Sequence, residues 1–403
     1  MRFRNRDGLL ILQSCATGLA KEQDLGPAMA SAKPRPQRKR KRAGKKTSAP
    51  PLYGAVDLGT NNCRLLIAQP SDGSFRVVDS HSQIARLGEG LNETGRLSDA
   101  AMNRALEAMS RIRAKLKARR VAHVRCIATE ACRRAENGAE FVARVREETG
   151  LGFRVIGPGE EARLAMLGCH DLIAEEAENV LVVDIGGGST ELSLVDVSAV
   201  SDAGDIHTLA RARAIRHWVS LPLGVVTLSE AFAHMRDETA AYEAMRAHAR
   251  EVLSGWKRRS DVLAAMAAGP SHLIGTSGTV TCLAGVHLGL HRYRRDAVDG
   301  AWMTRACAEA AIGRLRELGP AGRARLPTIG PERAGLMLSG CAIIDAAWEL
   351  YPAERLRVAD RGLREGLLLT MMYGPPRSKR RGRRRKASAA GAESETEAAS
   401  DGR

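Results

Sequence analysis

The sequence contains no long apolar run and no paired cysteines. None of its 403 residues lie in a stretch approaching the ~20 apolar residues of a membrane-spanning helix. The apolar segment Leu9–Leu12 is too short for the core of a signal peptide. The eight cysteines form no C-x-x-C pair, and the ten histidines show no metal-ligand spacing, which argues against a zinc site and a disulfide framework. We therefore expect a cytoplasmic protein with reduced thiols and no membrane span.

The basic charge is concentrated at the two ends of the chain. The net charge is +16, but residues 1–50 hold 13 Lys/Arg against 3 Asp/Glu, and residues 375–403 hold 9 against 4. The runs Arg38–Arg42 and Lys379–Lys386 lie in Pro/Ala/Ser-rich sequence that cannot bury a core. We predict a disordered basic tail at each end, over 1–50 and 375–403. These tails are suited to contacts with polyanions such as polyphosphate or RNA, and Met29 is an alternative start.

Strands and helices alternate between the tails. Apolar and β-branched runs predict strands at 54–57, 63–68, 75–79, 121–128, 153–156, 180–183 and 192–195. Helical spacing predicts helices near 139–149, from Gly159, and from Ser98, which is a good N-cap residue. This alternation indicates an α/β architecture.

One pattern occurs twice in the chain. Val56-Asp57-Leu-Gly59 matches Val183-Asp184-Ile-Gly186, and seven positions after each Asp stands a charged residue, Arg64 or Glu191, followed by Leu. Two copies of one hairpin indicate duplication rather than a solenoid, because the period is too long for stacked repeats. We predict two similar domains, over residues 51–178 and 179–374, that face each other across a cleft.

Each copy also carries a glycine-containing loop after an apolar strand. Glycine lets a backbone approach a ligand closely, and successive N–H groups can bind phosphate oxygens. An Asp at the end of a buried strand is costly unless it is paired or bound to a metal. A tight turn explains a single loop of this kind equally well. Two loops at matched positions predict a phosphate-binding cleft.

These loops resemble the phosphate loops of the actin-like superfamily, and other segments are similar to motifs of the Ppx/GppA family of exopolyphosphatases and guanosine pentaphosphatases. The similar segments, in order, are Asp57–Arg64, Ala128–Asn137, Ile156–Arg163, Asp184–Glu191, Ser220–Gly224 and Gly275–Thr279. Mild departures are Asn62, Gly157 and Cys282. The resemblance covers residues 53–373, and several motifs in the right order are hard to obtain by chance.

The resemblance implies a two-domain actin-like, ribonuclease-H-like α/β fold with its active site in the interdomain cleft. It also implies that a helix near 359–373 packs back on the first domain. The implied activity is exopolyphosphatase: water attacks the terminal phosphoanhydride of inorganic polyphosphate with Mg²⁺, or alternatively Mn²⁺, as cofactor. Hydrolysis of guanosine pentaphosphate (pppGpp) in the stringent response is the alternative, and a homodimer is left open.

The resemblance also implies residue roles. Asp57, Asp184 and Glu191 would hold the metal, and Glu161 would activate the attacking water. The implied phosphate-binding residues are Gly59, Thr60, Asn61, Asn62, Arg64, Arg133, Gly186, Gly187, Gly188, Ser189 and Thr190. Two plainer readings stay open: Glu161 opens a helix, where the dipole favours a carboxylate anyway, and Arg133 could form a surface ion pair.

Two functions of other classes are also compatible with parts of the sequence. An actin-like kinase or chaperone would share the loops but would need an adenosine pocket and would retain ADP. A polyanion-binding protein with a vestigial active site would suit the basic tails. The presence of every expected carboxylate argues against the second, and Glu161 argues against the first.

Overall fold

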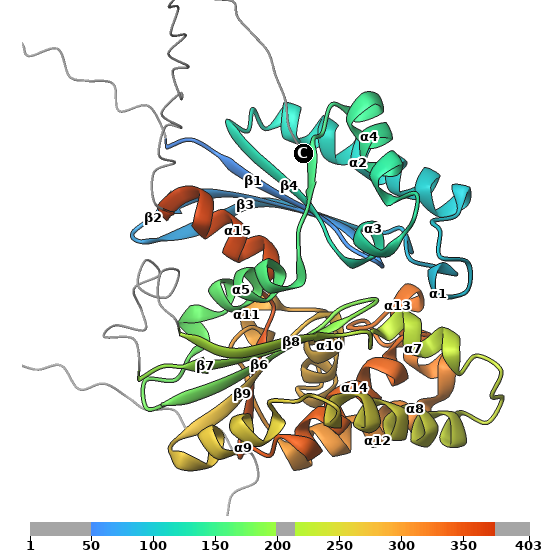
Figure 1. The fold of residues 1–403 in the computed structure, drawn as a ribbon, viewed down its shortest axis with the longest axis vertical. Coiled ribbons are helices and arrows are strands. Elements are labelled where there is room, and N and C mark those ends of the chain that lie inside the picture. Colours follow the sequence, from blue (N-terminus) through green and yellow to red (C-terminus); the bar gives the residue numbers. More distant parts are fainter. Residues whose placement is uncertain (1–49, 199–213, 375–403) are drawn as a thin grey trace, which may run out of the picture. The chain divides into compact units, whose positions relative to one another are not determined.

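Two β-sheets organise the chain in the computed structural model, which describes residues 50–198 and 214–374 (Figure 1). Apart from Pro50, the predicted tails lie outside the described residues. The first sheet has the strand order β3-β2-β1-β4-β5, and the second has the order β10-β11-β9-β6-β7-β8. The strands of the first sheet all precede Ile156 and those of the second all follow Glu178. The predicted domain boundary at 178/179 falls between them and stays a prediction.

The first sheet is built from the early strands of the chain. Its strands are β1 (Tyr53–Leu58), β2 (Asn62–Ser71), β3 (Ser74–Ile84), β4 (His123–Ala128) and β5 (Phe153–Val155). The helices that accompany it are α1 (Leu91–Thr94), α2 (Asp99–Ala118), α3 (Glu130–Arg134) and α4 (Gly138–Thr149). The predicted N-cap of α2 is confirmed, because the Ser98 side chain accepts a hydrogen bond from the Ala101 backbone N–H.

The second sheet has six strands, and eight helices lie between its strands β8 and β11 in the described chain. Its strands are β6 (Asn179–Ile185), β7 (Thr190–Asp196), β8 (Ile215–Leu221), β9 (Ser271–Thr276), β10 (Trp302–Thr304) and β11 (Arg355–Ala359). Its helices are α7 (Val225–Ala231), α8 (Glu238–Ser254), α9 (Arg259–Ala268), α10 (Gly278–His287), α11 (Arg295–Val298), α12 (Arg305–Arg325), α13 (Pro331–Ala334) and α14 (Met337–Leu350). Helix α12 is kinked at Gly319, which has a positive φ and precedes Pro320.

The repeated sequence pattern is a repeated hairpin, as predicted. Strands β1 and β2 pair antiparallel with Asp57 opposite Arg64, and β6 and β7 pair with Asp184 opposite Glu191. The seven-residue spacing therefore becomes a direct cross-strand pair in both copies. Each hairpin also has a parallel neighbour, β4 beside β1 and β9 beside β6.

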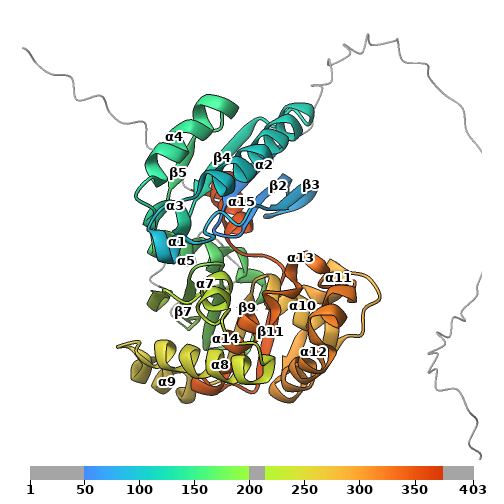
Figure 2. The same ribbon diagram turned by 90° about the vertical axis from the view of Figure 1, so that its right-hand side faces the viewer.

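Helices cover both faces of each sheet. Along β1, Val56 and Leu58 join the core beneath α2, whereas Ala55 faces the opposite core together with residues of α5 (Pro158–Gly168) and α15 (Leu363–Tyr373). In the second sheet, Leu181 packs with the C-terminal helices and Val180 packs with α5. The views in Figures 1 and 2 agree that α2 and α4 lie on one side of the first sheet and α15 on the other.

Helix α15 packs against α5, β1 and β2. A helix was expected from about residue 359, and this boundary is wrong. Residues 355–359 form β11, and the helix begins at Leu363 after the segment Asp360–Gly362. None of the helices in the described ranges has the length and apolar character needed to cross a membrane.

Candidate active site

A cavity of about 590 Å³ lies where loops of the two sheets meet. Both predicted phosphate loops line it: residues 59–62 and 64 from the first hairpin, and residues 184–189 from the second. Further segments contribute from farther along the chain, among them 276–281, 327–337 and 359–365. The cavity exceeds the space that one phosphoryl group requires, so it has room for an extended anion.

The first loop joins β1 to β2 and is fixed by its own backbone. The Gly59 N–H donates to the Asn62 carbonyl oxygen over 3.0 Å. Behind the loop, the Thr60 carbonyl accepts from the Gly88 N–H, and the Asn61 carbonyl accepts from two backbone N–H groups after β3. The carbonyl groups of the loop are thus used for support, which leaves the other side of the loop to the cavity.

The second loop is supported by the segment 220–226, which contains the 220–224 motif that the sequence left without a structural role. The carbonyl oxygens of Gly186 and Gly187 accept from the backbone N–H groups of Val225 and Val226 at 3.0 and 2.8 Å. A Cβ on Gly224 would come within 2.2 Å of the Gly187 carbonyl oxygen, so only glycine fits there. Helix α7 therefore begins directly against the backbone of this loop.

Three of the carboxyl groups that line the cavity were predicted as site residues. Asp57 and Glu161 are each 8% exposed, and Asp184, near the end of β6, is half-buried. Burial raises the pKa of Asp57, and burial together with the nearby Glu191 raises the pKa of Asp184 to about 8. Burial and Glu191 also raise the pKa of Glu161 well above the usual carboxyl range, against the opposing effect of Arg133. Acidic groups crowded in this way favour a bound cation.

The donor set around Asp57 fits a hard divalent cation. Within the described residues, Asp57 Oδ1 and the side-chain oxygens of Asn61 and Asn62 are buried without a hydrogen-bond partner. Mg²⁺ takes oxygen ligands and commonly uses one or two carboxylates together with water and phosphate oxygens. In the part of the chain that the structure describes, no group of three or more acidic, His or Cys side chains is arranged to hold a metal. Asp57 and Asp184 are therefore the residues suited to share an ion with a phosphate ligand.

Three of the predicted site residues do not line the cavity. Glu191 Oε1 accepts hydrogen bonds from the hydroxyls of Ser189 and Ser220 at 2.7 and 2.6 Å. Thr190 is fully buried, and its hydroxyl donates to the Leu223 carbonyl. These two side chains stabilise the second loop from behind. Arg133 is the third.

Arg133 lies against the predicted catalytic carboxylate. It is in the short helix α3, which the sequence analysis did not predict, and its Nη1 donates to Glu161 Oε2 over 3.2 Å and to the Ile156 carbonyl over 2.8 Å. The neighbouring Glu160 points elsewhere, because it forms a two-bond ion pair with Arg154. The two adjacent glutamates of α5 thus have different surroundings, and only Glu161 lines the cavity.

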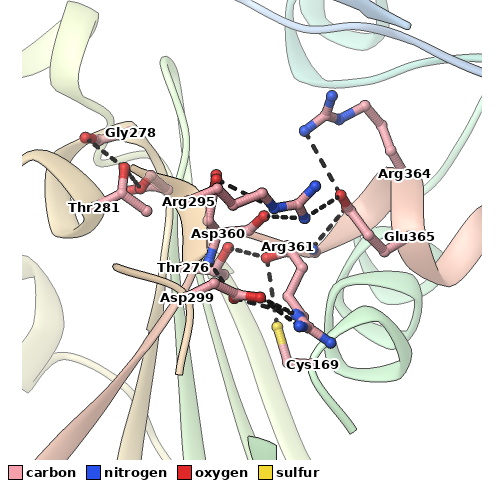
Figure 3. A network of polar contacts seen from close by, with 12 residues as sticks. Cys169, Thr276, Gly278, Thr281, Arg295, Asp299, Asp360, Arg361, Arg364 and Glu365 are labelled. Carbon is pink, nitrogen blue, oxygen red and sulfur yellow. Dashed lines mark hydrogen bonds and ion pairs between the residues drawn. The ribbon is translucent and has the colours of Figure 1, made fainter. Parts of the chain in front are cut away.

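Four arginines on the far side of the cavity were missed by the sequence analysis: Arg295, Arg333, Arg361 and Arg364. Figure 3 shows three of them, Arg295, Arg361 and Arg364, in a polar network at the start of α15. Arg361 pairs with Asp299 and Asp171, and Arg295 donates to Glu365 and to the Asp360 carbonyl. These two guanidinium groups are therefore occupied by acidic partners.

Arg64 and Arg364 are placed differently. Arg364 Nη2 lies 3.9 Å from the nearest Glu365 oxygen, and Arg64 stands opposite Asp57 in the hairpin. Burial and the charge of Arg364 both lower the pKa of Arg64, and both side chains line the cavity. Two half-buried guanidinium groups in a cavity with backbone loops are suited to bind a polyanion.

Comparison with known proteins agrees with this arrangement. The model of the Ppx/GppA phosphatase family matches residues 66–374. The crystal structure of the Aquifex aeolicus member of that family is 29% identical, with a TM-score of 0.63, over 80% of this chain and 97% of that chain. An exopolyphosphatase-like protein is 26% identical, with a TM-score of 0.68, over 80% and 98%.

An exopolyphosphatase from Cytophaga hutchinsonii is similar in fold, with a TM-score of 0.68 and 24% identity over 79% of this chain and 97% of that chain. The predicted actin-like α/β fold with two sheets is confirmed. The match to the family model spans most of the chain and includes Glu161, Arg364 and the second loop. This chain belongs to the Ppx/GppA phosphatase family.

Proposed function

We propose that the protein is an exopolyphosphatase, which hydrolyses the terminal phosphoanhydride of inorganic polyphosphate and releases orthophosphate. The observation that carries this proposal is Glu161: a buried carboxyl with a raised pKa that lines the same cavity as two matched phosphate loops. A group of this kind is suited to accept a proton near neutral pH. Membership of a phosphatase family supports the same reaction class.

The chain would bind its substrate through backbone and arginine donors. The backbone N–H groups of residues 59–62 and 186–189 would contact the terminal phosphoryl group. Arg64 and Arg364 would contact the following phosphates with their planar guanidinium groups. The arginines that pair with Asp299 and Glu365 would act mainly to hold the start of α15 in place.

Glu161 would orient and deprotonate the attacking water. The water oxygen forms a bond to the terminal phosphorus while the bridging P–O bond breaks, and the shortened polyphosphate leaves with the electron pair of that bond. The proton from water passes to Glu161 and then to solvent. Arg133 would hold the carboxylate in place through its bond to Oε2. A Mg²⁺ ion bound by Asp57 and Asp184 would neutralise charge on the phosphate oxygens.

Hydrolysis of pppGpp is the second candidate, and one part of the cavity favours it. Beyond the arginines, the wall contains the apolar side chains of Ile329, Leu336 and Met337 and the ring of Tyr293. Inorganic polyphosphate offers nothing for an apolar wall to contact, whereas a guanosine does. The same site chemistry would then remove the 5′-terminal phosphate of a nucleotide.

Phosphate release from polyphosphate, pppGpp and ATP, measured in parallel with and without Mg²⁺, tests the proposal. We expect release from polyphosphate to depend on Mg²⁺ and to exceed release from ATP. A faster rate with pppGpp would favour the second candidate. Release no greater than that of the Glu161→Gln protein on every substrate would refute hydrolysis, and retention of ADP after turnover of ATP would indicate a kinase or chaperone.

A further inference from the structure

The Thr60 side chain is held in one orientation at the edge of the cavity. It is 5% exposed, and its hydroxyl Oγ1 lies 3.0 Å from Glu130 Oε2, to which it donates. On the other side its methyl group packs against the backbone of Gly88, where an added Cβ would come within 2.3 Å of Cγ2. The Thr60 carbonyl also accepts the Gly88 N–H. The rotamer of Thr60 is therefore fixed from both sides.

Glu130 is likewise held between the two loops. It is 5% exposed, and its second oxygen, Oε1, accepts a hydrogen bond of 2.8 Å from Arg134 Nη1. Arg134 is itself anchored, because its Nη2 donates to Asn92 Oδ1 over 2.8 Å. A Cβ on Gly188 would lie only 1.9 Å from Glu130 Oε2, so the carboxylate touches the second loop directly. One carboxylate thus contacts the first loop through Thr60 and the second through Gly188.

The hydrogen bond determines what Thr60 offers to a ligand. A threonine hydroxyl has one proton and two lone pairs, and an ionised carboxylate only accepts. Since the proton is directed to Glu130, the side of Oγ1 that remains carries lone pairs. Thr60 also lines the cavity. Its hydroxyl can accept there from a water or contribute an oxygen to a cation, but it cannot donate to a phosphate oxygen without giving up its bond to Glu130.

We propose that Glu130 is a positioning residue that makes the Thr60 hydroxyl an acceptor, so that Thr60 serves the divalent cation or its bound water rather than the phosphate. This inference rests on the proposed function and revises one expected role, because Thr60 was predicted to bind phosphate. The buried charge of Glu130 agrees with it: a carboxylate beside the loops opposes an anion bound alone and favours a cation bound with it.

Binding of Mn²⁺, used in place of Mg²⁺ and followed by electron paramagnetic resonance, tests the inference without catalysis. We expect Thr60→Val and Glu130→Ala each to weaken Mn²⁺ binding by about tenfold or more, the range seen when groups that orient metal ligands are removed. Thr60→Ser should bind nearly as well as the unchanged protein. The double variant should bind Mn²⁺ with the same affinity as Glu130→Ala, because both substitutions remove the same hydrogen bond between Thr60 and Glu130. Thr281→Val is the matched control: Thr281 lines the same cavity, but its hydroxyl donates to the carbonyls of Ser277 and Gly278.

Binding of inorganic tripolyphosphate in the presence of EDTA supplies the second measurement. Thr60→Val should leave this affinity unchanged, and Glu130→Ala should increase it. If Thr60→Val instead weakens tripolyphosphate binding and leaves Mn²⁺ binding intact, Thr60 is a phosphate donor and the inference is wrong. If the unchanged protein releases phosphate but binds no Mn²⁺, the inference fails while hydrolysis stands. If it neither releases phosphate nor binds Mn²⁺, both proposals fail.

Discussion

Arg133 Nη1 donates a hydrogen bond to Glu161 Oε2 across 3.2 Å and joins helix α3 of the first sheet to the first turn of α5. Arg133 was predicted to contact phosphate, yet the structure directs its guanidinium to the predicted base. The cation opposes the upward effect of burial on the pKa of Glu161. A residue placed in this way affects both the position and the protonation of the carboxylate.

Replacing Arg133 should therefore change the pH dependence of the reaction. In Arg133→Gln the opposing cation is gone, so the pKa of Glu161 rises further and the ionised base is lost at a higher pH. The acidic limb of the kcat/KM profile should move to higher pH, and it can be measured from pH 5 to 9 with polyphosphate. Arg144→Gln, which breaks an exposed pair with Glu148, is the control and should leave the profile in place. An unchanged profile with a raised KM would show that Arg133 binds substrate.

The two adjacent glutamates of α5 should respond very differently to the same change. Glu161→Gln keeps the shape of the side chain but removes the base, so kcat should fall by at least on the order of 10²-fold with little effect on substrate affinity. Glu160→Gln weakens only the pair with Arg154 and should keep most of the activity. Single-turnover rates and equilibrium binding of polyphosphate separate the two effects. A Glu161→Gln protein with more than a third of the original rate would assign the base elsewhere.

Metal removal should abolish activity reversibly. Asp184 has a pKa raised to about 8 by burial and by Glu191, a situation that a bound divalent cation would relieve. Activity should vanish in EDTA and return with Mg²⁺ or Mn²⁺, and it should not return in Asp184→Asn, whose fold is checked by circular dichroism. Full activity in excess chelator would contradict the metal requirement.

Gly188→Ala should damage the site through one identifiable contact. The added Cβ would lie 1.9 Å from Glu130 Oε2, so the carboxylate must move and release Thr60. We expect a loss of about 1–3 kcal/mol in the free energy of unfolding together with reduced activity. Much of this loss in stability should disappear when Glu130→Ala is already present, which urea unfolding of the double variant would show. Gly152→Ala is the control, because a Cβ there meets nothing within 4 Å.

Ser277 combines a helix cap with an unfavourable backbone conformation. Its φ is 136°, and its side chain accepts from the Thr279 N–H at the start of α10. Ser277→Ala loses the cap and keeps the strain, so it should lower the free energy of unfolding by about 1 kcal/mol. Ser277→Gly also loses the cap but relieves the positive φ, and it should be clearly less destabilised. Equal losses in urea unfolding of the two variants would show that the backbone there is unstrained.

The sequence predicted the local features of the site and missed the features that depend on distant contacts. The two hairpins could be predicted from the sequence because each is a local feature. Asp57 and Arg64 are cross-strand neighbours within one hairpin, and Asp184 and Glu191 are cross-strand neighbours within the other. Helix α3 has only five residues, too few for helical periodicity to be seen. The helix expected from residue 359 begins at Leu363, because the apolar run before it pairs as β11.

Residues that reach the site from distant parts of the chain could not be predicted, because nothing in their local sequence indicates that they lie there. Arg364 enters the cavity because α15 packs on the first sheet, about 300 positions from Arg64 in the chain. Glu130 was assigned no role by the sequence analysis, and only the structure reveals its bond to Thr60. The sequence likewise did not determine the partner of Arg133, because a guanidinium group binds a carboxylate or a phosphate equally well.

The contact between α5 and α15 limits how these two helices can move relative to each other. A Cβ on Gly168 would come within 2.0 Å of the Gly362 carbonyl oxygen, and one on Gly366 within 1.9 Å of the Leu164 carbonyl oxygen, so these helices touch backbone to backbone. No layer of side chains lies there that could slide or repack. Glu161 is in the first turn of α5 and Arg364 in the first turn of α15. We therefore expect the predicted base and the proposed phosphate-binding cation Arg364 to move together as one rigid unit, with their separation preserved when the cavity widens to admit a long substrate.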